Sequence, residues 1–174
     1  GIGLGTSLLL FLSVVLHELG HALVALREGV KVRSITLFLM GGVARVDQEC
    51  DTAMGAFRVA AAGPLVSLLL ALGLGLVLPF GQGLSPLVGF VVIQLAGLNL
   101  MLGLFNLLPG LPLDGGLILK ALIWRFTGSR EKGMQVATAS GRALSLTALL
   151  YGLALLVFVR NPAGLWMMLL GWFG

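Results

Sequence analysis

Long apolar runs constrain the fold of this chain more than any other feature, because an α-helix needs about 20 apolar residues to cross a bilayer. Four runs reach this length, at residues 2–26, 53–78, 87–108 and 134–159, and residues 163–174 form a shorter one. Hydrophobic residues make up 58% of the 174 residues and charged residues 10%, with a mean hydropathy of +1.06. Polar side chains could not cover so much apolar surface in water. We therefore expect an all-α polytopic membrane protein with four to six transmembrane helices in a lipid bilayer.

The connection after the first run predicts a small β-hairpin. Its residues alternate loosely in polarity from Val32 to Met40, and a second short extended segment ends at Val46. Gly41 and Gly42 lie between the two segments, and a Gly-Gly pair in this position is typical of a hairpin turn. We therefore expect a hairpin within residues 31–48.

A later connection, residues 109–133, combines a Pro/Gly-rich turn with a short helix over residues 117–126. We expect residues 1–174 to form a single domain around these elements. The chain begins with Gly1 rather than Met and stops at Gly174 within an apolar run. We therefore expect it to be a fragment of a longer protein.

The basic residues predict the orientation of the chain in the membrane. If the four long runs alternate in direction, all of the 11 Lys and Arg residues except Arg160 fall on the same side. Cytoplasmic connections carry such an excess of Lys and Arg. We therefore expect the hairpin and residues 109–133 to face the cytoplasm. The net charge of +4 does not indicate a nucleic-acid partner, because the basic residues lie in short connections between apolar runs.

An H-E-x-x-H motif, His17-Glu18-Leu19-Gly20-His21, lies inside the first apolar run. Histidines four residues apart lie on one face of a helix and can bind the same zinc ion. Glu18 lies about 100° round the helix from His17, which suits a general base for a water molecule better than a third ligand. The alternative is two unrelated buried histidines. These are the only two histidines in the chain, and an unpaired glutamate at membrane depth would be costly, so we favour the zinc site.

Asp114 is the residue that we expect to complete the ligand set. A catalytic zinc site has three protein ligands and one open position, and the single Cys50 lies in a charged connection, where it suits a small filler residue. Asp114 follows Pro109 and Pro112, which prevent a continuous helix, and precedes Gly115-Gly116, which permit a tight turn. The alternative role for Asp114 is the N-cap of the short helix that follows. Because His17 and His21 supply only two of the three protein ligands that a catalytic zinc site needs, we favour the metal role for Asp114.

Other polar residues in the apolar runs are less decisive. Asn106 lies eight residues before Asp114, and its amide could donate a hydrogen bond to a developing oxyanion or form an interhelical hydrogen bond. The residues themselves leave both roles open. We interpret Gln94 and Asn99 as polar groups in helix packing, and Gly63, Gly73 and Gly75 as residues that permit close helix approach.

These features together predict a membrane metallopeptidase, and three alternatives fit the residues less well. A metal transporter or channel would place its metal-binding groups along a path across the bilayer, whereas the residues above cluster at one side. The hydropathy excludes a soluble zinc peptidase. An inactive membrane scaffold is disfavoured by the intact Glu18.

The chain resembles the site-2 proteases, a family of intramembrane zinc metalloproteases. The resemblance rests on the H-E-x-x-H motif at residues 17–21 and on Asn-Leu-Leu-Pro-Gly-Leu-Pro-Leu-Asp-Gly-Gly at residues 106–116. Residues 61–64, Ala-Ala-Gly-Pro, are similar to the family's middle motif, although Ser67 stands where an Asn is often found. The compact connections resemble the branch of the family that often carries C-terminal CBS domains.

The resemblance implies a zinc endopeptidase whose metal is held by His17, His21 and Asp114 below the cytoplasmic surface. It implies Glu18 as the general base and Asn106 as a residue that binds the substrate or the transition state. It implies membrane-spanning protein substrates, often anti-sigma factors or membrane-tethered transcription factors already cut by another protease. CBS domains, if present, would lie beyond the end of this sequence.

Overall fold

The structure is a computed structural model that describes residues 2–30, 32–38, 41–46, 50–80 and 85–173. These residues form two compact units, 1–107 and 108–174. The first unit contains α1 (Ile2–Arg27), β1 (Val32–Phe38), β2 (Gly41–Val46), α2 (Ala53–Val77), the short 3-10 helix η1 (Leu78–Phe80) and α3 (Pro86–Asn106). The second contains α4 (Asp114–Thr127), α5 (Arg130–Val157) and α6 (Ala163–Phe173).

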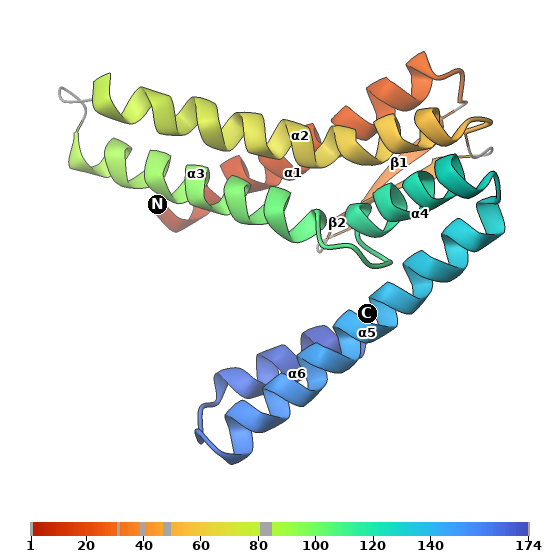
Figure 1. Cartoon of the computed structure of the whole chain (residues 1–174). Helices are drawn as coiled ribbons and strands as arrows, with labels where there is room; N and C mark the ends of the chain where they lie inside the picture. The colour runs from red at the N-terminus through yellow and green to blue at the C-terminus, as the bar shows by residue number, and fades with distance from the viewer. Residues whose placement is uncertain (1, 31, 39–40, 47–49, 81–84, 174) are drawn as a thin grey trace. The chain divides into compact units, whose positions relative to one another are not determined.

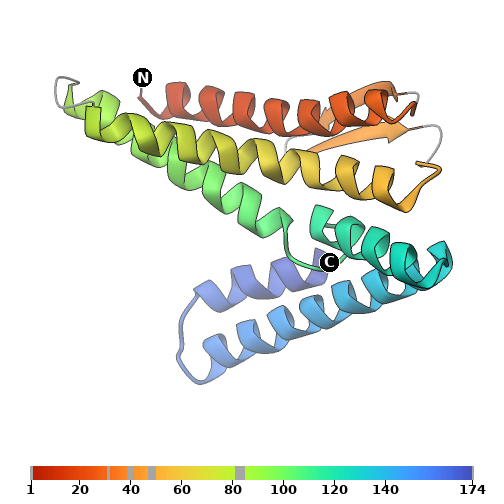
Figure 2. The same cartoon turned by 45° about the horizontal axis from the view of Figure 1, so that its top comes forward.

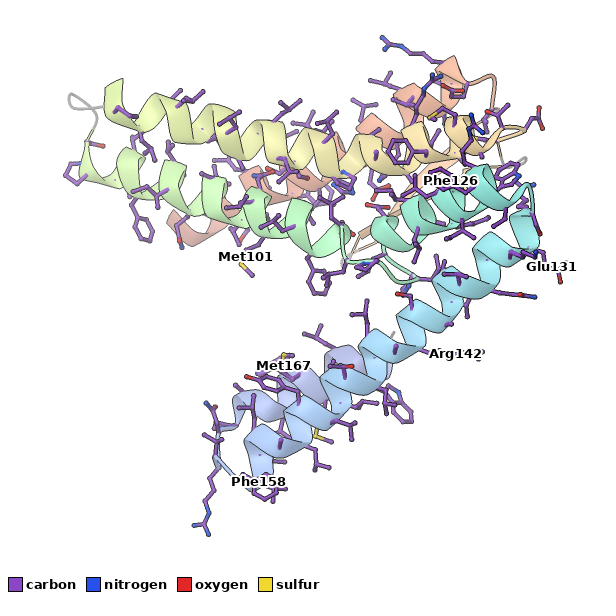
Figure 3. The ribbon with its side chains drawn as sticks, in the orientation of Figure 1. Met101, Phe126, Glu131, Arg142, Phe158 and Met167 are labelled. Carbon is purple, nitrogen blue, oxygen red and sulfur yellow. The ribbon has the colours of Figure 1, made fainter. Side chains whose placement is uncertain are left out.

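Four of the helices are long and apolar enough to cross a membrane. They are the segments Gly5–Arg27, Ala53–Val77, Pro86–Asn106 and Arg130–Val157, which match the four long runs of the sequence. Large apolar side chains on these helices are exposed, including Met101 at 68%, which points away from α3 in Figure 3. Such exposure suits lipid as the solvent. The predicted fold class, a helical polytopic membrane protein with a small hairpin, is confirmed.

In the first unit, α2 packs against both α1 and α3, and Figures 1 and 2 show the three helices grouped together. The helices approach closely where a residue has no side chain. A Cβ at Gly20 of α1 would lie 3.1 Å from the carbonyl oxygen of Ala62, and a Cβ at Gly103 of α3 would lie 3.3 Å from that of Pro64. Small residues commonly allow membrane helices to pack this closely.

A buried hydrogen bond joins α1 to α3. The Nδ2 atom of Asn99 donates to Ser13 Oγ at 3.0 Å and to the carbonyl oxygen of Leu95 at 2.9 Å. Asn99 is fully buried, which confirms its interpretation as a helix-packing polar group. Gln94, by contrast, is exposed, so the same interpretation was wrong for that residue.

The hairpin is an antiparallel two-stranded sheet, and both of its strands contact α1. Gly41 pairs with Phe38 and Gly42 pairs with Leu37, so the Gly-Gly pair lies in β2. The prediction that Gly41-Gly42 forms the turn was therefore wrong, because both glycines pair with residues of β1. Residues 31, 39, 40, 47 and 48 of the predicted 31–48 segment lie outside the described residues.

In the second unit, α4 and α5 form a helical hairpin, and α6 packs against α5. Gly128 ends α4 in a left-handed conformation with φ of 70°, which glycine adopts without strain. Ser129 then caps α5 by accepting a hydrogen bond from the Lys132 backbone at 3.3 Å. This cap explains why α5 begins at Arg130, before the apolar run predicted from residue 134.

Candidate metal centre

His17 and His21 lie one turn apart on α1 with their Nε2 atoms directed toward each other. The two Nε2 atoms are 3.3 Å apart, and the ring planes meet at 75°. Two nitrogen ligands at about 2.0–2.1 Å from a tetrahedral zinc ion would be about 3.3 Å apart. The measured separation therefore fits a shared zinc ion. His17 is buried and His21 is half-buried.

The orientation of His21 is set by the backbone of α2. Its Nδ1 atom lies 2.7 Å from the carbonyl oxygen of Val59. A carbonyl oxygen only accepts hydrogen bonds, so Nδ1 carries the proton and donates it. In the neutral ring, Nε2 then has its lone pair available for a metal.

The orientation of His17 is also set by α2, in this case by a side chain. Its Nδ1 atom lies 2.9 Å from Oγ of Ser67, and both residues are buried. A serine hydroxyl can accept the Nδ1 proton, which leaves Nε2 of His17 as a metal ligand in the same way. Metal-binding histidines usually donate their second ring nitrogen to such a partner.

Gly63, between these two contacts on α2, leaves space for the imidazoles. A Cβ added there would overlap Nε2 of His21 and lie 2.6 Å from Nε2 of His17. At Gly73 and Gly75 of the same helix, an added Cβ would have nothing within 4 Å, so the interpretation of close helix approach was wrong for these two residues. The interpretation of Gly63 as a residue that permits close helix approach was therefore incomplete. The two histidine rings are the neighbours that require its small size.

Glu18 and Asp114 are both half-buried acids at helix positions consistent with the predicted chemistry. Glu18 follows His17 directly on α1. Asp114 is the first residue of α4, whose N-cap is Leu113 and lacks a side-chain cap hydrogen bond. The alternative role of Asp114 as an N-cap is therefore not the one that the structure gives it.

Asn106, the last residue of α3, uses its amide within its own helix. Its Nδ2 atom donates to the carbonyl oxygen of Leu102 at 3.1 Å. This bond is neither of the two roles that the sequence left open. Asn106 is half-buried, and a role in substrate binding stays a prediction.

His17 and His21 bring two imidazole nitrogens together in the first unit, and Asp114, the first residue of α4 in the second unit, is the acid that the sequence predicts as the third ligand. Two imidazoles and one carboxylate are a donor set found in catalytic zinc sites, where the fourth position stays open. The residues therefore fit zinc.

Sequence reasoning missed two contributors to this centre. Ser67 was noted as a departure from a resembled motif, with no role of its own. The carbonyl of Val59 carries no sequence signal, because every residue has one. The spacing of Val59, Gly63 and Ser67, four residues apart on one face of α2, becomes informative once α2 is known to face the H-E-x-x-H motif.

A transmembrane helix that carries two converging histidines and an adjacent glutamate defines the site of a membrane metallopeptidase. Comparison with known proteins agrees with this class. The family model for Peptidase family M50 matches residues 5–92 and 81–148. The chain therefore belongs to peptidase family M50, which confirms the predicted zinc metalloprotease class and favours it over a metal transporter.

Individual relatives are similar over nearly the whole chain. A protein of Synechocystis that is named as a zinc metalloprotease is 48% identical, over 99% of this chain and 45% of its own length. Rip3 of Mycobacterium tuberculosis, also named as a zinc metalloprotease, is 42% identical over 44% of its length. The chain thus spans a little under half the length of these curated relatives.

The fold also matches a solved structure. The site-2 protease from Methanocaldococcus jannaschii aligns with a TM-score of 0.69 and 39% sequence identity, over 93% of this chain and 73% of that one. This similarity confirms the resemblance to site-2 proteases inferred from the two motifs.

Proposed function

We propose that this chain is the catalytic core of an intramembrane zinc endopeptidase that hydrolyses peptide bonds in membrane-spanning segments of protein substrates. The observation that carries the proposal is the pair of Nε2 atoms 3.3 Å apart on a helix long enough to cross a membrane. Each ring is held through Nδ1 by α2, so the nitrogens that face each other are those suited to a metal. Membership of peptidase family M50 supports the same reaction.

The proposed ligands are His17, His21 and Asp114, and the proposed metal is zinc. Zinc would supply Lewis-acid polarisation of the scissile carbonyl and activation of water near neutral pH. The three side chains supply two neutral donors and one negative charge, which partly offsets the charge of a divalent cation in an apolar setting.

Glu18 is the proposed general base. It is the acid adjacent to His17 on α1, and it lies about 100° round the helix from that residue, beside the metal-facing surface rather than on it. From there its carboxylate can take a proton from the attacking water and later deliver it to the leaving amine. Asn106 is proposed to donate from its amide to the substrate carbonyl, which requires it to leave its bond to Leu102.

A substrate helix must unwind before it is cut, because its carbonyls are hydrogen-bonded and shielded within the helix. The β1–β2 hairpin contacts α1, the helix that carries the histidines. We propose that an unwound substrate adds as a strand to an edge of this hairpin. N-methylation of successive substrate backbone nitrogens tests this idea. Strand addition predicts inhibition with a period of two residues, and a uniform effect along the peptide would contradict it.

The site is proposed to face the cytoplasm, because Lys and Arg gather on the side of the H-E-x-x-H end of α1. Lys132, in the first turn of α5, offers a test. A Lys132→Cys variant in a Cys50→Ser background should react with a membrane-impermeant thiol reagent in inside-out vesicles and stay unlabelled in right-side-out vesicles. The reverse pattern would contradict the orientation. Anti-sigma factors, membrane-tethered transcription factors and attached CBS domains stay predictions from family resemblance.

The central experiment is metal analysis and peptide cleavage with the protein purified in detergent. Wild-type protein should contain one zinc ion per chain and cut membrane-spanning peptides, and a zinc chelator should abolish cleavage. Glu18→Gln should keep the zinc and lose cleavage, because the amide cannot accept the water's proton. Glu131→Gln, at an exposed position in the first turn of α5, is the matched control and should cut normally. Full cleavage by Glu18→Gln would discard the assigned base.

A further inference from the structure

We propose that Ser67 is a positioning residue for the metal centre, which holds the His17 ring so that Nε2 faces the metal. The proposal rests on the proposed function, because it assigns a partner to one of the proposed zinc ligands. Its physical basis is the 2.9 Å contact between Ser67 Oγ and His17 Nδ1 across two helices.

The spacing of contacts on the two helices explains why the rings converge. Val59 and Ser67 are eight residues apart, which is about 12 Å along α2, whereas His17 and His21 are four residues apart, about 6 Å along α1. The two Nδ1 atoms therefore reach outward to partners beyond the pair, at Val59 and Ser67. The two Nε2 atoms consequently face each other beside Gly63.

The hydroxyl of Ser67 contacts a histidine ring, unlike the hydroxyls of Ser13 and Ser145. Ser13 and Ser145 donate from Oγ to the carbonyl four residues earlier, at 3.1 Å and 3.0 Å. That intrahelical bond is the ordinary choice for a helical serine. Ser67 instead places its Oγ against a ring on the neighbouring helix. The contact therefore specifies an interhelical arrangement rather than satisfying a local one.

The burial of Ser67 makes its hydroxyl hard to replace. Its exposed fraction is 0%, and that of His17 is 4%. Removal of the hydroxyl would take a buried acceptor away from the Nδ1 proton of His17, which is costly. The ring would then gain by turning away or by moving the proton to Nε2, and either change removes a metal ligand. The partner of His21 is the backbone carbonyl of Val59, which a substitution cannot remove. The partner of His17 is the Ser67 side chain, which a substitution can remove.

The test is zinc affinity, measured on the whole chain in detergent by competition with a chelator. Ser67→Ala should weaken zinc binding about 10–100-fold, the usual loss when a partner of a metal-binding histidine is removed. Ser145→Ala is the matched control, because it removes a part-buried helical serine bond that does not reach a histidine, and it should bind zinc as wild type does. Ser67→Thr and Ser67→Asn both retain an oxygen acceptor, and at least one of them should restore the affinity.

A second measurement separates positioning from general stability. With Co²⁺ in place of zinc, the visible absorption bands report the ligand geometry, and they should shift in Ser67→Ala and not in Ser145→Ala. The thermal unfolding midpoint of the metal-free protein should be similar in the two variants.

The outcomes distinguish this inference from the proposed function. Wild-type affinity in Ser67→Ala would overturn the positioning role and leave the zinc protease intact. Equal losses in the Ala, Thr and Asn variants, together with a lower unfolding midpoint, would also overturn it, because they would indicate a packing role. A wild-type protein that binds no zinc would instead reject the proposed function itself.

Discussion

His21 donates its Nδ1 proton to the backbone carbonyl of Val59, 2.7 Å away on the neighbouring helix. One of the two facing imidazoles is therefore oriented by the path of α2 and not by any side chain. Since α2 is held against α1 by close packing at Gly20 and Gly63, the orientation of His21 follows from helix packing.

Truncation of Val59 should consequently leave the metal centre unchanged. Val59→Ala keeps the carbonyl and removes apolar atoms that pack against Ala25, Val30 and Cys50. We expect a loss of stability of about 0.5–1.5 kcal/mol, as for the loss of a similar amount of buried side chain, with wild-type zinc affinity. Thermal unfolding and chelator competition measure the two quantities. A zinc affinity that falls along with stability would mean that the carbonyl is not held independently of the side chain.

Addition of a methyl group at Gly63 should disrupt the centre. The new Cβ would overlap Nε2 of His21 and approach Nε2 of His17 to 2.6 Å. We expect Gly63→Ala to lower zinc affinity at least about 10-fold, comparable to the loss of an outer-shell partner. Gly73→Ala on the same helix is the control, because no atom lies within 4 Å of its Cβ. It should bind zinc normally and be as stable as wild type or more so, since Ala favours helices over Gly by about 1 kcal/mol.

Neutralisation of Asp114 should reduce zinc binding. Asp114→Asn preserves the shape of the side chain and removes the negative charge and one strong donor oxygen, so we expect less than one zinc ion per chain after purification. Asp51→Asn provides the control, because Asp51 is an exposed aspartate ahead of α2. An unchanged zinc content in Asp114→Asn, at equal protein recovery, contradicts the ligand role.

Removal of the Asn106 amide should impair catalysis without loss of metal. If the amide stabilises a developing oxyanion, Asn106→Ala should lower kcat by about 10²–10³-fold. Zinc content should match wild type, because Asn106 is not one of the three proposed ligands. Peptide cleavage rates and metal analysis on the same sample check both parts. Cleavage at the wild-type rate by Asn106→Ala would contradict the catalytic role and leave Asn106 only its hydrogen bond to Leu102.

The Asn99–Ser13 contact should contribute to stability and not to the metal centre. Asn99→Ala removes two hydrogen bonds of a fully buried amide, one of them between helices. Interhelical hydrogen bonds in membrane proteins contribute about 0.6 kcal/mol on average and up to about 1.7 kcal/mol, so we expect a loss within this range from that bond. The exposed Gln94→Ala is the control for unfolding measurements in detergent. A weaker zinc affinity in Asn99→Ala would show that the contact reaches the histidines.

Local patterns in the sequence predicted the helices well, because the length of an apolar run is a property of the run itself. The α1 and α2 helices end within one residue of the predicted runs. The ends set by capping were harder to predict. Ser129 starts α5 four residues before the apolar run at residue 134. Strand pairing likewise placed Gly41-Gly42 within β2, where the sequence predicted the hairpin turn.

The sequence by itself determined that His17 and His21 share a helical face, because four-residue spacing in a helix places them there, and that Glu18 lies directly beside His17. Tertiary structure decided which atoms orient those groups. Ser67 lies 50 residues from His17, and the carbonyl of Val59 differs from no other carbonyl until α2 packs against α1. Spacing within one helix is local and can be derived from the order of residues, whereas the partner of a ring nitrogen depends on how two helices pack.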